Sequence, residues 1–234
     1  MFTDSGHLRT TLVVTPGGQA GAEAAAPRQE PRPGAGCAAE PADRRAPAGR
    51  RAETLLGLRN RALLAVAYDT LARRSELVTL LVEDIEAGEH GAASILIRRS
   101  KVDQEGVGDI RYLAPDTMRY LRAWLAGAAI TEGPIFRGVA KGGRVAGALS
   151  SAAVAEIFKA MATAAGVSIE DAARISGHSS RAGAAQDMAR HGLELPSIMQ
   201  AGGWRTATMV ARYTARLDAR RSGAAKLAVL QDRG

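Results

Sequence analysis

Residues 176–192 read SGHSSRAGAAQDMARHG, a stretch typical of a helix that Gly192 ends. His178 and Arg181 lie three residues apart where this helix would begin, and Ser179 and Ser180 are residue types that cap helix N-termini. A helix start presents N–H groups and a positive dipole end, which favours an anion. An arginine can donate two parallel hydrogen bonds to phosphate oxygens. The stretch therefore indicates either a phosphate site or simply a loop histidine beside a surface arginine.

Helical patterns continue on both sides of this stretch. Helices are predicted over 57–72, 116–127, 150–166, 181–190, 195–203 and 206–217, and the segment 73–85 is predicted to be a helix that runs into a turn. Two short segments, 93–101 and 110–115, are rich in β-branched residues and predict an antiparallel hairpin. The expected fold class is therefore α+β, mainly helical, with a small antiparallel sheet.

The first 52 residues differ in composition from the rest. Six of the nine prolines lie there, and Phe2 is the only aromatic residue among them. Such a composition buries too little apolar surface to offset the entropy of ordering, so 1–52 is expected to be a disordered Gly/Ala/Pro-rich tail. Within it, the segment 8–14 (LRTTLVV) is a candidate strand. Residues 53–234 are expected to form the folded domain.

Charge and cysteine content limit the function classes. The 234-residue chain has a net charge of +7, which favours a polyanionic partner, most often nucleic acid, although a basic soluble protein would also fit. Its single cysteine, Cys37, supports no disulfide framework and fits a reducing compartment. With no run of 18 apolar residues and no secretory pattern at the N-terminus, we expect no membrane association.

A second group of charged residues lies in the segment 72–77 (ARRSEL). An arginine in an apolar helix must reach solvent or find a partner. Arg73 and Glu76 have the spacing of an ordinary intrahelical ion pair, which contributes little to stability. The alternative is that Glu76 supports an arginine that is directed into a cleft.

Two further residues, Lys101 and Tyr213, have two interpretations each. Lys101 is expected where the first hairpin strand ends, either as a solvated edge residue or as a proton donor. Tyr213, with Trp204 nine residues before it, fits a core aromatic. A phenol has a pKa near ~10, so it is a weak nucleophile unless a neighbour takes its proton and cations stabilise the oxyanion.

Several common catalytic motifs are absent from the sequence. It contains no GxxxxGK[ST] loop, no HExxH and no CxxC, and its four histidines are scattered. A metal-dependent nuclease would need clustered carboxylates or histidines. We therefore expect no cofactor and no metal, so that any phosphate chemistry would depend on the cations of the protein itself.

Five motifs occur in a familiar order: ARRSEL (72–77), RRSK (98–101), GHSSR (177–181), GGW (202–204) and ARYTARLD (211–218). Together they resemble the catalytic domain of the tyrosine recombinase (phage integrase) family, over roughly residues 58–234. Each motif alone is weak, and the order and spacing make the resemblance specific. It implies site-specific DNA cleavage and rejoining through a 3′-phosphotyrosyl intermediate.

The resemblance also implies roles for individual residues. Arg73 and Arg181 would hold the non-bridging oxygens of the scissile phosphate, with Glu76 orienting Arg73. Lys101 would protonate the departing 5′ oxygen.

His178 would assist proton transfer, Trp204 would donate its indole N–H to the phosphate, and Tyr213 would be the nucleophile.

Partners and alternatives follow from the same resemblance. The partner would be double-stranded DNA, in the cytoplasm and nucleoid of a bacterial, phage or plasmid host. The family has a helical core-binding domain where this chain has the 1–52 tail. A C-terminal helix with Leu227 and Leu230 would link a homotetramer on DNA. A non-catalytic DNA-binding remnant and a type IB topoisomerase-like relaxing activity are the alternatives.

Overall fold

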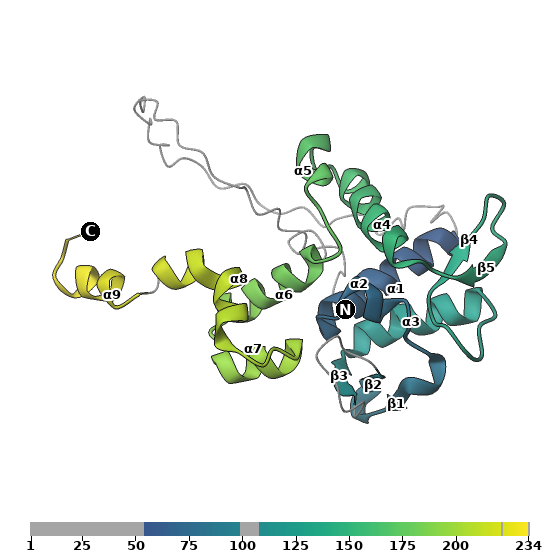
Figure 1. Cartoon of the computed structure of the whole chain (residues 1–234), viewed down its shortest axis with the longest axis horizontal. Helices are drawn as coiled ribbons and strands as arrows, with labels where there is room; N and C mark the ends of the chain where they lie inside the picture. The colour runs from purple at the N-terminus through teal and green to yellow at the C-terminus, as the bar shows by residue number, and fades with distance from the viewer. Residues whose placement is uncertain (1–53, 99–107, 221, 234) are drawn as a thin grey trace, which may run out of the picture. The chain divides into compact units, whose positions relative to one another are not determined.

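Helix α1 (Leu55–Thr70) is the central element of the fold (Figure 1). The computed structural model describes residues 54–98, 108–220 and 222–233. At the start of α1 the Thr54 hydroxyl accepts the Gly57 N–H at 3.1 Å. All residues from 62 to 67 are buried, because α1 packs against α3 and β3 and also against α6. The buried helix expected from the apolar run is therefore confirmed.

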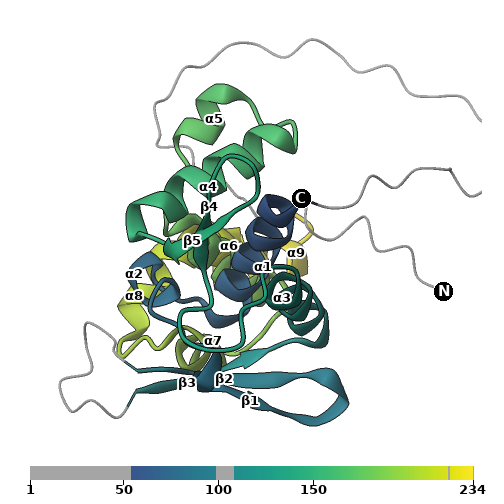
Figure 2. The same cartoon turned by 90° about the vertical axis from the view of Figure 1, so that its right-hand side faces the viewer.

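A three-stranded antiparallel sheet contains the predicted hairpin. Its strands are β1 (Ile85–Ala87), β2 (Ala93–Ile97) and β3 (Asp109–Leu113), in that order, as Figure 2 shows. Strands β2 and β3 pair antiparallel from Ala93↔Leu113 to Ile97↔Asp109, so the hairpin is confirmed. Alternate residues of a strand point to opposite faces. On β3 the buried residues are Arg111 and Leu113, so an arginine lies on the inner face of the sheet.

The helix predicted over 73–85 is wrong in extent. Helix α2 spans only Arg74–Leu77, and a 3-10 turn, η1 (Val82–Asp84), leads into β1, which the sequence did not predict. Around residue 81 the chain pairs with 133–135: the Leu80 carbonyl accepts the Ile135 N–H at 3.0 Å, and the Val82 N–H donates to Gly133. These tertiary hydrogen bonds replace the intrahelical ones that the sequence pattern favoured.

The middle of the chain adds helices and a second small sheet. Helices α3 (Pro115–Gly127) and α4 (Ser151–Ala164) confirm the predictions for 116–127 and 150–166. Elements that were not predicted are the 3-10 turn η2 (Glu89–Gly91), the hairpin of β4 (Arg137–Val139) and β5 (Val145–Ala148), and helix α5 (Ile169–Ala173).

The C-terminal part is helical, as expected. It consists of α6 (Ser179–Arg190), α7 (Leu195–Gly202), α8 (Ala207–Arg220) and α9 (Gly223–Leu230). A second apolar cluster joins α6, α7 and α8 to the end of α1; its buried members are Leu71, Ala184, Ala185, Ile198, Trp204 and Val210. In the described ranges, no helix combines the length and apolarity needed to cross a bilayer.

Two predictions lie outside the described residues. They are the tail over 1–52, with its candidate strand at 8–14, and Lys101.

Candidate active site

The site is built around the turn that ends α1. Leu71, a buried residue, has a left-handed backbone conformation with φ 50° and ψ 26°. Such a conformation is uncommon for a branched side chain and occurs where the surrounding structure holds it. The turn directs the Leu71 carbonyl to α6, where it accepts a hydrogen bond from Nη1 of Arg181 at 2.5 Å. It also brings Arg73 to the start of α2.

Arg73 and Glu76 form a tight local pair. The Arg73 Nη1 lies 2.5 Å from Oε1 of Glu76, and the backbone N–H of Arg73 donates to Oε2 at 2.7 Å. The Glu76 side chain is 6% exposed and that of Arg73 is 25% exposed. One carboxylate therefore holds both the backbone and the guanidinium of Arg73. This geometry favours the interpretation in which Glu76 supports an arginine at a site.

Arg181 is buried and is held by backbone carbonyls. It is 3% exposed; Nη1 binds the Leu71 carbonyl and Nη2 donates to the Gly202 carbonyl at 2.7 Å. Burial and the nearby charge of Arg73 lower the pKa of Arg181 to about 10, so this side chain is still charged at neutral pH. No carboxylate is hydrogen-bonded to it within the described ranges, so an anionic ligand would complete its charge balance.

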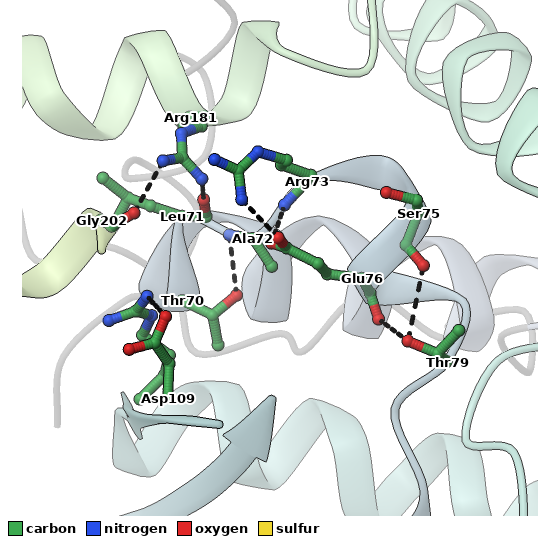
Figure 3. Close-up of polar contacts among 11 residues, drawn as sticks. Thr70, Leu71, Ala72, Arg73, Ser75, Glu76, Thr79, Asp109, Arg181 and Gly202 are labelled. Carbon is green, nitrogen blue, oxygen red and sulfur yellow. Dashed lines mark hydrogen bonds and ion pairs between the residues drawn. The ribbon is translucent and has the colours of Figure 1, made fainter. Parts of the chain in front are cut away.

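The guanidinium groups of Arg73 and Arg181 lie side by side (Figure 3). They come from the start of α2 and the first turn of α6, 108 positions apart in the chain. Two like charges in a partly buried site repel each other, and a phosphate between them would relieve that repulsion. The arrangement is therefore suited to binding two oxygens of one phosphate.

The start of α6 differs from the prediction. His178 is the N-cap residue and has no side-chain capping bond, so the expectation that Ser179 or Ser180 caps the helix is wrong. The Ser179 hydroxyl instead accepts the Ser176 N–H at 3.0 Å, in the turn before the helix. Ser180 is fully buried in the first turn, and its hydroxyl has no hydrogen-bond partner in the part of the chain that the structure describes.

His178 is exposed and lies near Arg73, Arg74 and Arg181. Partial desolvation and then the charges of Arg181, Arg74 and Arg73 lower its pKa below the usual 6.5, against a smaller opposing effect of Glu76. The surroundings of His178 therefore favour the neutral imidazole. A neutral imidazole beside an anion site can accept a proton.

The two glycines of the GGW motif have separate steric roles. A Cβ atom on Gly202 would lie 2.3 Å from the Trp204 ring, so only glycine leaves room for the indole. Gly203 has φ 59°, and a Cβ there would lie 2.1 Å from Nη2 of Arg111. After this left-handed residue, the Trp204 N–H closes the end of α7 by donating to the Met199 carbonyl at 2.9 Å.

Trp204 and Tyr213 are the remaining two predicted site residues that the structure describes. The Arg181 Cζ lies 4.4 Å from the centroid of the Trp204 ring, and the Trp204 and Tyr213 ring centroids are 5.6 Å apart. Tyr213 is half-buried on α8, where its carbonyl accepts a hydrogen bond from Gln186 at 3.1 Å. Neither the Trp204 indole N–H nor the Tyr213 hydroxyl has a hydrogen-bond partner among residues 54–98, 108–220 and 222–233.

Arg111 is a residue that the sequence analysis missed. It is 7% exposed on β3, with Nη1 donating to the Gln200 carbonyl at 2.8 Å and Nη2 to the Asp109 carboxylate at 2.9 Å. Burial lowers its pKa, and it interacts electrostatically with Glu76 and Arg73. The one hint in the sequence was that Arg111 and Leu113 are two residues apart on a predicted strand, so their side chains point to the same face. That pattern predicts an inward side chain for Arg111 but does not indicate its partner.

The structure thus brings together six of the seven predicted site residues. Arg73, Glu76, Arg181, Trp204 and Tyr213 are linked by the contacts above, and His178 adjoins the arginines. The seventh, Lys101, lies outside the described residues.

Two curated proteins are similar to this chain in sequence. Recombinase cre of Escherichia phage P1 is 34% identical over 172 residues, which are 69% of this chain and 50% of that protein. The integrase/recombinase xerD homolog of Selenomonas ruminantium is 36% identical over 169 residues, 69% of this chain and 48% of that protein. This chain therefore spans about half the length of these curated relatives.

A solved structure shows the same fold. The XerH site-specific recombinase bound to difH substrate, in a pre-cleavage complex, superposes with a TM-score of 0.56 at 21% identity. The match covers 72% of this chain and 46% of that chain. The phage integrase family profile matches residues 50–220. The resemblance in the five motifs is thereby confirmed, and this chain belongs to the phage integrase family.

Proposed function

We propose that this chain cleaves and rejoins double-stranded DNA at specific sites through a 3′-phosphotyrosyl intermediate on Tyr213. Residues 53–234 would act as the catalytic domain, in the cytoplasm of a bacterial, phage or plasmid host. Membership of the phage integrase family and similarity to named recombinases support this proposal.

The proposed step is a phosphoryl transfer to the phenol. The Tyr213 oxygen forms a bond to phosphorus while the bond from phosphorus to the 5′ oxygen breaks. The phenol proton passes to His178, and the 5′ oxygen takes a proton from Lys101. The new phosphodiester retains the bond energy, so attack by a 5′ hydroxyl of another strand reverses the step without ATP.

The protein's cations would supply the electrostatic stabilisation. Arg73 and Arg181 would each bind a non-bridging oxygen, and Trp204 would donate its indole N–H to the same phosphate. Charge grows on these oxygens in the transition state, and donors held in advance stabilise it without reorganisation. Glu76 and the Leu71 and Gly202 carbonyls hold the two arginines in this way before any ligand binds.

One observation carries the proposal: two guanidinium groups from distant parts of the chain lie side by side, and the Trp204–Tyr213 pair lies next to one of them. A structural ion pair would not need a second buried arginine whose hydrogen bonds, within the described ranges, go to neutral carbonyls.

A nicked suicide substrate tests the proposal. Wild-type protein should form a covalent adduct that resists denaturation, and peptide mapping should find the DNA on Tyr213. Tyr213→Phe should form no adduct but still bind the duplex. DNA binding without any adduct in wild type would instead favour the DNA-binding remnant. Relaxation of supercoiled DNA regardless of sequence would favour the topoisomerase-like activity.

We also propose assembly on DNA through α9. Its apolar residues Leu227, Val229 and Leu230 are 47%, 76% and 83% exposed, which is typical of a surface that a partner covers. A second copy would cover it in a closed head-to-tail homotetramer. Sedimentation on DNA carrying two sites should give a tetramer, which Leu227→Glu/Leu230→Glu should abolish. Wild-type monomers on that DNA would refute the assembly.

A further inference from the structure

Arg74 is the first residue of α2, next to the Arg73–Glu76 pair, and its side chain is exposed. The aliphatic part of the side chain packs over Gly177. A Cβ atom on that glycine would lie 2.8 Å from Cδ and 2.9 Å from Cβ of Arg74. Glycine at 177 therefore creates the space in which the Arg74 stem lies, at the turn just before His178.

The guanidinium of Arg74 has a different environment from its neighbours. Arg73 is bound by Glu76, and Arg181 by two carbonyls. For Arg74, no hydrogen bond or ion pair occurs with any residue that the structure describes. The charge of Arg74 nevertheless affects the site, because it is one of the charges that lower the pKa of His178.

We propose that Arg74 binds a DNA phosphate next to the one held by Arg73 and Arg181, as a backbone contact outside the reacting group. The inference rests on the proposed function for its ligand, duplex DNA. The Arg73 guanidinium binds Glu76, whereas the Arg74 side chain packs over Gly177, so the two arginines have different surroundings. The aliphatic part of Arg74 is already packed while its guanidinium is exposed. Binding a phosphate would therefore immobilise few additional side-chain bonds and break no hydrogen bond to a described residue.

Salt dependence of DNA binding measures this contact. Each phosphate contact contributes about 0.9 to the slope of log K against log salt. The probe is a fluorescent mixed-sequence DNA duplex, with Tyr213→Phe as the parent so that no covalent step interferes. Arg74→Gln should reduce the magnitude of the slope by about 1 and weaken binding at every salt concentration. Arg74→Lys should restore the slope.

A matched control separates a specific contact from loss of net charge. Arg122→Gln removes the same charge from an exposed position on α3 and should leave the slope unchanged. Gly177→Ala keeps the charge but displaces the Arg74 stem, and should weaken binding in the same direction as Arg74→Gln. Equal slopes for Arg74→Gln and its parent, or equal losses in Arg74→Gln and Arg122→Gln, would overturn the proposal.

The result is distinguishable from failure of the proposed function. If the wild-type protein forms no adduct on the suicide substrate but Arg74→Gln reduces the salt slope of its parent, the cleavage activity is refuted and the phosphate contact is retained. If the adduct forms but the slope does not change, the cleavage activity is retained and the phosphate contact is refuted.

Discussion

The guanidinium carbon of Arg181 lies 4.4 Å from the centre of the Trp204 ring, so one indole face covers a buried cation. A cation over an aromatic face is attracted by the ring quadrupole, most strongly when both are shielded from water. The ring also lies next to Tyr213, with ring centroids 5.6 Å apart. Trp204 therefore lies between Arg181, which is proposed to bind the phosphate, and Tyr213, the proposed nucleophile. Its removal should affect both the stability of the protein and the cleavage of DNA.

Trp204→Ala should lower the free energy of unfolding by about 3–5 kcal/mol, because it removes a buried aromatic side chain. Trp204→Phe keeps a ring over Arg181 and should cost less. Urea denaturation measures the stabilities. Adduct formation on the suicide substrate, at a temperature where both variants are folded, should be slower in the alanine variant. Equal stability of wild type and Trp204→Ala would show that the ring contributes no packing energy.

Glu76→Gln should destabilise the protein by about 1–3 kcal/mol, since it weakens two hydrogen bonds of a buried carboxylate to Arg73. It should also slow adduct formation, because Arg73 loses the charge that orients it. The matched control is Glu132→Gln, at an exposed position, which should unfold as wild type does. Adduct formation at the wild-type rate in Glu76→Gln would contradict the orienting role.

Gly203→Ala should be destabilising for two reasons: its φ of 59° is left-handed, and its Cβ would meet Arg111. The steric part should disappear when Arg111 is shortened. In a double-mutant cycle with Arg111→Ala, the Gly203→Ala change should therefore cost less than in wild type, with a coupling energy of about 0.5–3 kcal/mol. Chemical denaturation of the four proteins gives this energy. Additive effects would mean that the two side chains do not compete for space.

His178 should titrate below its ordinary pKa of 6.5 in the DNA-free protein, because desolvation and then Arg181, Arg74 and Arg73 oppose its charged form. NMR of the imidazole protons measures the pKa. Arg74→Gln should raise it toward the ordinary value, and added salt should act in the same direction. A pKa at or above 6.5 in wild type would contradict the electrostatic picture.

The sign of the linked stability follows from that shift. A histidine with a lowered pKa binds fewer protons in the folded state than in the unfolded state. The contribution of His178 to stability is therefore complete above pH 6.5, the unfolded value, and is lost as the pH falls through the folded pKa. His178→Ala should remove this part of the pH dependence of unfolding.

Much of the secondary structure followed from local patterns. The apolar run in α1, the β-branched hairpin strands and the motifs around His178 and Tyr213 each depend on neighbours within a few residues. Side-chain period and turn residues are encoded locally, so a single sequence was sufficient to predict them. The residue types needed for a phosphate site were also visible in order along the chain.

Only the tertiary structure decided how those residues meet. The helix predicted over 73–85 was interrupted because Leu80 and Val82 form hydrogen bonds with a segment some fifty positions away. Arg111 reaches Gln200, and Arg181 reaches the carbonyls of Leu71 and Gly202.

The physical reason is the range of the interactions. Local propensity is decided within one or two turns, whereas a buried guanidinium takes whichever carbonyl or carboxylate the folded chain brings within about 3 Å. The sequence by itself therefore determined the residue types, most of the longer helices and the hairpin of β2 and β3. The hydrogen-bond partners of Arg181, the contact between Arg111 and Gln200, and the packing of Arg74 over Gly177 existed only once distant segments had packed.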